Sequence, residues 1–101
     1  QSMERGGAVY IITNKNHTVL YTGVTSDLRS RIKQHINQTY PNSFTAKYNC
    51  NKLVWFELFN RIEEAIAKEK QIKDRSRAYK LSLINTMNPE WKDLWDEIEN
   101  W

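Results

Sequence analysis

The fold is decided by two short runs, Ala8-Val9-Tyr10-Ile11-Ile12 and Leu20-Tyr21-Thr22-Gly23-Val24. Both are rich in β-branched and aromatic residues, which favour strands, and the turn-like Asn14-Lys15-Asn16-His17 separates them. A hairpin closed by those four residues pairs Tyr10 with Tyr21, so two phenol rings lie side by side on one face of a sheet.

Side chains alternate along a strand, and therefore Gly23 and Thr25 share the face of Tyr21. A tyrosine beside a glycine is expected to leave open space next to its hydroxyl. That is the geometry of a site, although two strand tyrosines taken alone are more often ordinary sheet residues.

The residues after the hairpin predict a helix over 27–37, with Ser26 or Asp27 as N-cap. The apolar stripe of this helix consists of Leu28, Ile32 and Ile36. At 3.6 residues per turn, Arg31 and His35 lie together on one edge of that stripe. The basic residues on the far side, toward water, are Arg29 and Lys33. Arg31 can donate in fork geometry to a phosphate, and His35 can move a proton near neutral pH.

A second helix is predicted over 60–76, opened by a capping box in which Glu63 reaches back to Asn60. Its predicted buried stripe consists of Ile62, Ala65, Ile66 and Ile72. Glu69 projects into the middle of this stripe, where an ionised carboxylate is costly unless it is paired, hydrogen-bonded or coordinating a cation. Glu69 is therefore the candidate metal ligand, and a structural ion pair with Arg31 or a lysine is the alternative.

The complete order predicts an α/β (α+β) fold, ββαβα plus C-terminal helices. The expected strands are 8–14, 18–25 and 52–59, and the expected helices are 27–37, 60–76, about 78–87 and about 90–99. A small three-stranded antiparallel sheet flanked by helices is the natural closure. The predicted loop 38–51 carries basic and aromatic residues that can stack on unpaired bases or merely pin the loop. These are Tyr40, Phe44, Lys47 and Tyr48.

Charge is distributed unevenly around a net value of +3. No acidic residue occurs over 28–56, basic residues outnumber acidic ones over 68–80, and the balance reverses from Glu90 onward. A basic surface around a candidate site favours a polyanion such as nucleic acid.

Length and composition indicate a single small domain over residues 3–101. Gln1-Ser2 before Met3 looks like a protease-site scar from an expression tag. No apolar run is long enough to span a membrane. The single cysteine, Cys50, excludes an intrachain disulfide and a Cys-cluster zinc site, and these features together favour a cytoplasmic protein.

In its strand and helix motifs the chain resembles the GIY-YIG nuclease superfamily, in particular its small single-domain, excision-repair-nuclease-like members. The matching segments are, in order, Ala8-Val9-Tyr10, Tyr21-Thr22-Gly23, residues 23–35, residues 64–73 and residues 88–94. No single triplet is specific, but these motifs follow one another at compatible spacings over roughly residues 7–95.

The resemblance implies hydrolysis of DNA phosphodiesters with one divalent cation, Mg²⁺ or Mn²⁺, bound at Glu69. The implied catalytic residues are Tyr10, Tyr21, Arg31, His35 and Glu69. Either Tyr21 or His35 is the general base, and the residues do not choose between them. The expected substrate-binding residues are Gly23, Thr25, Arg29, Lys33, Phe44, Lys47, Tyr48, Lys73 and Asn88.

Two rival interpretations stay open. One is a non-catalytic nucleic-acid-binding module of the same fold, although binding alone needs no inward-facing Glu69. The other is a nuclease subunit that is active only with a protein partner. The chain carries no second module that would read a base sequence, so the expected substrate is branched, flapped or single-stranded DNA with little sequence preference.

Overall fold

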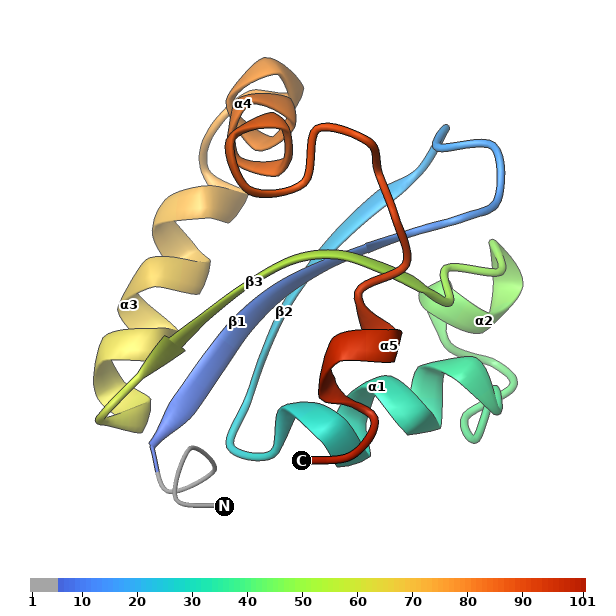
Figure 1. The fold of residues 1–101 in the computed structure, drawn as a ribbon, viewed down its shortest axis with the longest axis horizontal. Coiled ribbons are helices and arrows are strands. Elements are labelled where there is room, and N and C mark those ends of the chain that lie inside the picture. Colours follow the sequence, from blue (N-terminus) through green and yellow to red (C-terminus); the bar gives the residue numbers. More distant parts are fainter. Residues whose placement is uncertain (1–5) are drawn as a thin grey trace.

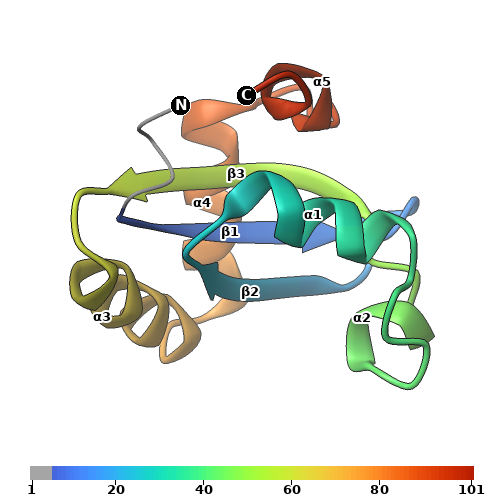
Figure 2. The ribbon, with the colours of Figure 1, turned by 90° about the horizontal axis from the view of Figure 1, so that it is seen from below.

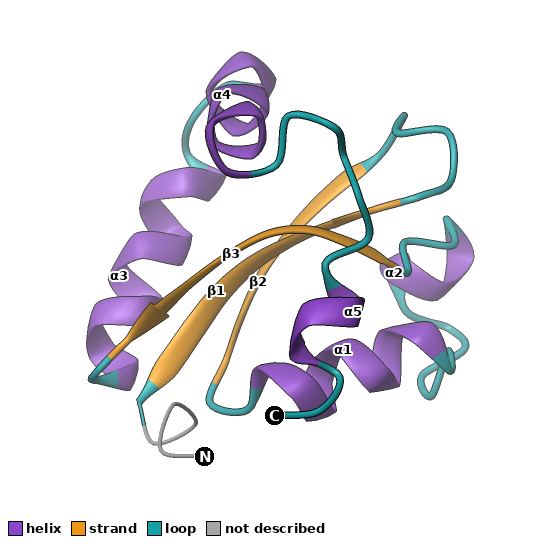
Figure 3. Ribbon diagram, viewed as in Figure 1, coloured by secondary structure: helices purple, strands orange, loops and turns teal. Residues whose placement is uncertain are grey.

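The structure, a computed structural model, describes residues 6–101, so the expected scar at Gln1-Ser2 lies outside the described residues. The elements are β1 (Gly7–Thr13), β2 (Leu20–Thr25), α1 (Leu28–Ile36), α2 (Phe44–Lys47), β3 (Lys52–Phe59), α3 (Ile62–Lys73), α4 (Arg77–Met87) and α5 (Trp95–Ile98). The predicted three-stranded antiparallel sheet is confirmed, in the order β2-β1-β3 (Figures 1 and 3).

The central strand β1 is buried on both faces, and its side chains alternate between two hydrophobic clusters. Tyr10 and Ile12 pack toward α1 and α5, whereas Val9 and Ile11 pack toward α3 and α4. The two helix layers are seen on opposite sides of the sheet in Figures 1 and 2. Edge strand β2 is bonded within the sheet only to β1, so its outer side is free to border a site.

The hairpin register predicted from the sequence was wrong by two residues. Tyr10 lies opposite Gly23, and Tyr21 lies opposite Ile12. The loop is longer than expected because the Asn14 side chain organises it, accepting hydrogen bonds from the backbone N–H groups of Thr18 (2.8 Å) and Val19 (3.1 Å). A shift of two keeps every side chain on its face, so both tyrosines still share one face, with ring centroids 6.5 Å apart.

The open space expected beside Gly23 is filled by the ring of Tyr10. A Cβ atom at residue 23 would overlap the Tyr10 hydroxyl and ring. The glycine therefore leaves room for the Tyr10 ring to lie across the neighbouring strand β2.

The helices agree with the prediction in part. Asp27 is the N-cap of α1, accepting from Ser30 N, as one of the two expected alternatives. The capping box at residue 60 was wrong, because α3 starts after Arg61 with no side-chain cap, and Glu63 pairs instead with Arg61 at 3.7 Å. Ile66, placed in the buried stripe, is 38% exposed. Part of the predicted 38–51 loop forms the short helix α2, capped by Ser43.

The C-terminal helix expected over 90–99 is reduced to Trp95–Ile98. The preceding segment is used to cover the β3 edge: Leu94 N–H donates to the Leu53 carbonyl (2.7 Å), and Asp93 accepts from the Leu53 N–H (3.2 Å). Trp91 has φ 56°, which no α-helix accommodates. Within residues 6–101, no helix combines the length and apolar character needed to cross a membrane.

Candidate active site

A hydrogen-bonded chain of side chains joins β1, α1 and α2. The Tyr10 hydroxyl lies 3.0 Å from His35 Nε2, and His35 Nδ1 lies 3.0 Å from Thr45 Oγ1. Tyr10 is 1% exposed and His35 is 8% exposed. When Nε2 accepts from Tyr10, the Nδ1–H donates to Thr45; in the other tautomer both directions reverse. Both imidazole nitrogens are thus occupied by partners from the protein.

Burial keeps this pair neutral. It raises the pKa of Tyr10 to about 12, opposed by the nearby Arg31 and reinforced by Tyr21. Burial also lowers the pKa of His35 to about 4, and the Arg31 charge adds to the effect. At neutral pH the imidazole is uncharged and a weak proton acceptor, so the geometry suits a positioning role better than the base role considered from the sequence.

The Arg31 guanidinium lies close to the hydrogen-bonded pair of Tyr10 and His35. It donates to Gln34 Oε1 (2.9 Å) and lies 5.8 Å from the centre of the Tyr40 ring. Among residues 6–101, no carboxylate forms an ion pair with Arg31. An arginine with no internal acid is available for an external anion such as phosphate.

Tyr21 of β2 lies close to one ring from α1 and one from α2. Its ring is 6.0 Å from the His35 ring and stacks on Phe44 at 6.1 Å. In the described part of the chain, the Tyr21 hydroxyl has no hydrogen-bond partner, in contrast to that of Tyr10. The two tyrosines therefore differ in kind: one is buried and bonded, and the other is half-buried with its hydroxyl free.

Glu69 reaches the same region from α3. Its side chain is 12% exposed and accepts from Lys73 Nζ at 2.8 Å. Of the two ion-pair partners considered from the sequence, Arg31 or a lysine, the structure has a lysine. The hydrogen bond to Glu69 raises the pKa of Lys73, and Lys73 Nζ lies 5.7 Å from the Tyr21 ring centre. The Lys73 ammonium thus lies beside Tyr21 of edge strand β2, with the Glu69 carboxylate bonded to it.

Glu69 is suited to one kind of metal site. No group of three or more His, Cys, Asp or Glu side chains that could hold an ion occurs within residues 6–101. A single nearly buried carboxylate oxygen fits Mg²⁺ or Mn²⁺, because Mg²⁺ keeps several waters and is bound by one or two carboxylates plus substrate phosphate. It does not fit Zn²⁺, which needs three or four protein ligands.

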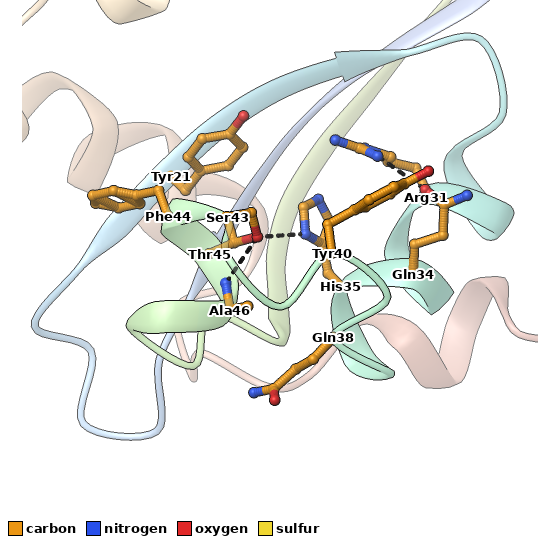
Figure 4. A pocket seen from close by; sticks show the side chains of 10 residues that line it. All are labelled: Tyr21, Arg31, Gln34, His35, Gln38, Tyr40, Ser43, Phe44, Thr45 and Ala46. Atoms are coloured by element: carbon orange, nitrogen blue, oxygen red, sulfur yellow. Dashed lines mark hydrogen bonds between the residues drawn. The ribbon is translucent and has the colours of Figure 1, made fainter.

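A pocket of about 280 Å³ opens beside Tyr21, Arg31 and His35. Its remaining walls come from the end of α1, the following loop and α2: Gln34, Gln38, Tyr40, Ser43, Phe44, Thr45 and Ala46 (Figure 4). Sequence analysis missed the contributions of Gln34, Gln38, Ser43 and Thr45. The one available signal was Ser43, an N-cap residue whose Oγ accepts from Ala46 N at the start of α2.

The other predicted substrate contacts lie outside this pocket. Thr25 bonds locally to Asp27, and Arg29 Nε donates to the Glu99 carbonyl at 2.6 Å. Lys33 and Lys47 are exposed. Asn88 is 5% exposed, and its amide donates to the carbonyls of Val54 (3.2 Å) and Lys92 (2.8 Å), so it secures the C-terminal segment against β3.

The neutrality of His35 predicts a pH dependence of stability. The unfolded chain protonates this histidine below about pH 6.5, whereas the folded chain does so only near pH 4. Unfolding is therefore increasingly favoured as pH falls through this window, by up to about 3 kcal/mol. Urea denaturation between pH 7 and 4 should show this slope, and His35→Gln should flatten it while His17→Gln keeps most of it. Equal slopes in wild type and His35→Gln would contradict the assignment.

Comparison with known families, sequences and structures shows which proteins this chain is similar to. The family described as the GIY-YIG catalytic domain matches residues 6–88. A UPF0213 protein of Syntrophus aciditrophicus is 38% identical over 82 residues, covering 81% of this chain and 92% of the relative. A UPF0213 protein of Clostridium perfringens is 38% identical over 90 residues, covering 89% and 95%. The solution NMR structure of a UPF0213 protein from Bacillus halodurans shares the fold, with TM-score 0.55, 30% identity and coverage of 86% and 90%.

Proposed function

The chain belongs to the GIY-YIG family, a nuclease family, and on this premise we propose that it is a metal-dependent endonuclease that hydrolyses DNA phosphodiester bonds. The observation that carries the proposal is the placement of Arg31. Its guanidinium has no acidic partner in residues 6–101 and lines one pocket with Tyr21. The Tyr21 ring in turn lies 5.7 Å from Lys73 Nζ, the partner of Glu69. A phosphate placed there meets a cation, a hydroxyl and a metal-ligand candidate together.

Arg31 has the chemistry of a transition-state stabiliser. Its N–H donors can bind the phosphoryl oxygens in fork geometry, and charge accumulates on these oxygens during hydrolysis. Tyr40, whose ring faces the guanidinium, and Gln34, which accepts from it, hold the fork in place. This preorganisation limits the rearrangement needed when charge develops.

Tyr21 is the residue we assign to the attacking water. Its hydroxyl is free of internal partners, so it can accept a hydrogen bond from water and orient it, or take its proton. Tyr10 and His35 support Tyr21 through ring contacts and are positioning residues, because their own polar atoms bond to each other.

Glu69 would hold the divalent cation, Mg²⁺ or Mn²⁺, largely through water. When bound, the cation would supply Lewis-acid polarisation of the phosphate and stabilisation of charge on the leaving oxygen. Lys73 now occupies the Glu69 carboxylate at 2.8 Å and must yield it, which leaves its ammonium free to meet the DNA backbone.

The competition between Lys73 and the cation for Glu69 predicts a measurable effect of substituting Lys73. Lys73→Met removes the cation that competes at Glu69, so the Mg²⁺ concentration for half-maximal cleavage should fall several-fold. The dissociation constant of Mn²⁺, measured by calorimetry without DNA, should fall with it. Lys70→Met, which removes an exposed lysine of the same helix, is the matched control. Weaker Mn²⁺ binding in Lys73→Met would contradict the competition.

The proposed substrate is DNA with unpaired or branched regions. The basic groups are spread over α1, α2 and α3, a pattern suited to backbone contact rather than base-edge readout. Little sequence preference is therefore expected. A repair role, a protein partner that adds specificity and a cytoplasmic location complete the proposal, the last on the basis of the lone free thiol of Cys50.

Cleavage maps test the proposal directly. Flapped and single-stranded substrates should be cut faster than intact duplex in Mg²⁺, and binding should weaken steeply between low and moderate salt. A non-catalytic module would bind the same DNA with the same salt dependence but leave it intact. Cutting at one defined duplex sequence, insensitive to salt, would refute the proposed substrate class.

A further inference from the structure

The pocket beside the site has aromatic residues at both ends. Phe44 stands next to Tyr21 at one end and Tyr40 next to Arg31 at the other (Figure 4). Tyr40 is 55% exposed and Phe44 is 49% exposed, although both are large apolar rings. Exposed aromatic rings around a hollow are a common arrangement for binding a flat ligand.

The charge of the pocket narrows the class of ligand. Arg31 is the single charged residue in its lining, since His35 is neutral and no carboxylate contributes. The other polar groups are the amides of Gln34 and Gln38 and the hydroxyls of Ser43 and Thr45. A lining of rings and amides with one cation at the edge suits a neutral heteroaromatic group attached to an anion.

The size of the pocket further restricts the class of ligand. A volume of about 280 Å³ lies just below the usual range for small-molecule sites, so it holds one ring system rather than a duplex. Tyr21 and Arg31 belong both to the pocket wall and to the site proposed for the phosphate. A ligand seated in the pocket is therefore adjacent to the reacting phosphate.

We propose that this pocket is a subsite for one unpaired nucleobase next to the cleaved phosphate, held in contact with the Phe44 and Tyr40 rings that line it. The inference rests on the proposed nuclease function and adds a physical reason for its substrate preference. A paired base is held in its stack and cannot enter, so duplex DNA must first lose a pair at this position at a cost of a few kcal/mol. Single-stranded and flapped DNA bear little or none of this cost.

The test separates base binding from cleavage. Two short single-stranded oligonucleotides are compared, one wholly abasic and one carrying a single base in an otherwise abasic backbone. Their dissociation constants are measured by fluorescence anisotropy with the full chain bearing Glu69→Gln, so that no cleavage intervenes. The base should increase affinity roughly ten- to a hundredfold, the range for stacking on aromatic side chains.

Variants localise the effect. Phe44→Leu and Tyr40→Leu should remove most of the gain from the base, whereas Phe44→Tyr and Tyr40→Phe should keep it. Met87→Ala, at another exposed hydrophobic residue, should keep it as well. Because Phe44 and Tyr40 are half-exposed, all these variants are expected to fold, and melting temperatures check this.

Each outcome decides between the two claims. Equal affinity for the two oligonucleotides, or a gain that survives both leucine variants, overturns the base subsite whether or not the wild-type chain cleaves DNA. A base-dependent gain that requires Phe44 and Tyr40 supports the subsite even if wild-type protein cuts no substrate, in which case only the nuclease function fails.

Discussion

Replacing Glu69 with glutamine should reduce DNA cleavage by at least two to three orders of magnitude while the fold survives, because the neutral amide is a poor ligand for a hard divalent cation. Glu69 pairs with Lys73, whose ammonium lies 5.7 Å from the centre of the Tyr21 ring, and the Glu69 side chain is only 12% exposed. The substitution keeps its size, so packing on α3 is retained. Initial rates on a flapped substrate in Mg²⁺, with thermal melting of both proteins, provide the measurement.

The matched control for this prediction lies on the same helix. Glu64→Gln removes an equal charge at an exposed position near the start of α3 and should leave the rate unchanged. Excess EDTA should stop wild-type cleavage as completely as Glu69→Gln does. Full activity in EDTA would show that the chain does not depend on a divalent cation, and the role assigned to Glu69 would fail with it.

The general layout of the site could be predicted because it rests on local periodicity. Alternation along the strands places Tyr10 and Tyr21 on one face whether the register is shifted by two or not. Helical spacing likewise places Arg31 beside His35, and the inward direction of Glu69 follows from the apolar stripe of α3. These features depend on a period and not on distant contacts.

What the sequence did not reveal depends on individual side-chain hydrogen bonds, which leave no periodic pattern in the sequence. The shape of the loop after β1 is set by hydrogen bonds to the Asn14 side chain. The position of the C-terminal segment is set by its hydrogen bonds to Leu53. The pocket forms because Ser43 caps a helix too short to show periodicity, which brings Thr45 to His35. The neutral state of His35 follows from its burial in the folded chain, so a sequence pattern could not separate its role from that of Tyr21.

Substitutions of Arg31 and Tyr21 should separate chemistry from binding. Arg31→Ala and Tyr21→Phe should each lower single-turnover cleavage by roughly two or more orders of magnitude, as loss of a transition-state donor or a proton-transfer group typically does. The dissociation constant for DNA should change far less, because many basic residues share the backbone contact. Rapid-quench rates and anisotropy titrations on the same substrate measure the two effects.

The control variants make the same two substitutions at an arginine and a tyrosine outside the proposed site. Arg61→Ala removes an exposed arginine at the start of α3, and Tyr79→Phe removes a hydroxyl on α4; both should retain wild-type rates. His35→Gln distinguishes the two candidate bases: with Tyr21 at the water, it should cost much less than Tyr21→Phe, since His35 acts through Tyr10. A larger loss for His35→Gln than for Tyr21→Phe would transfer the base to the histidine. Equal losses in affinity and rate for Tyr21→Phe would instead favour a module that binds DNA without cutting it.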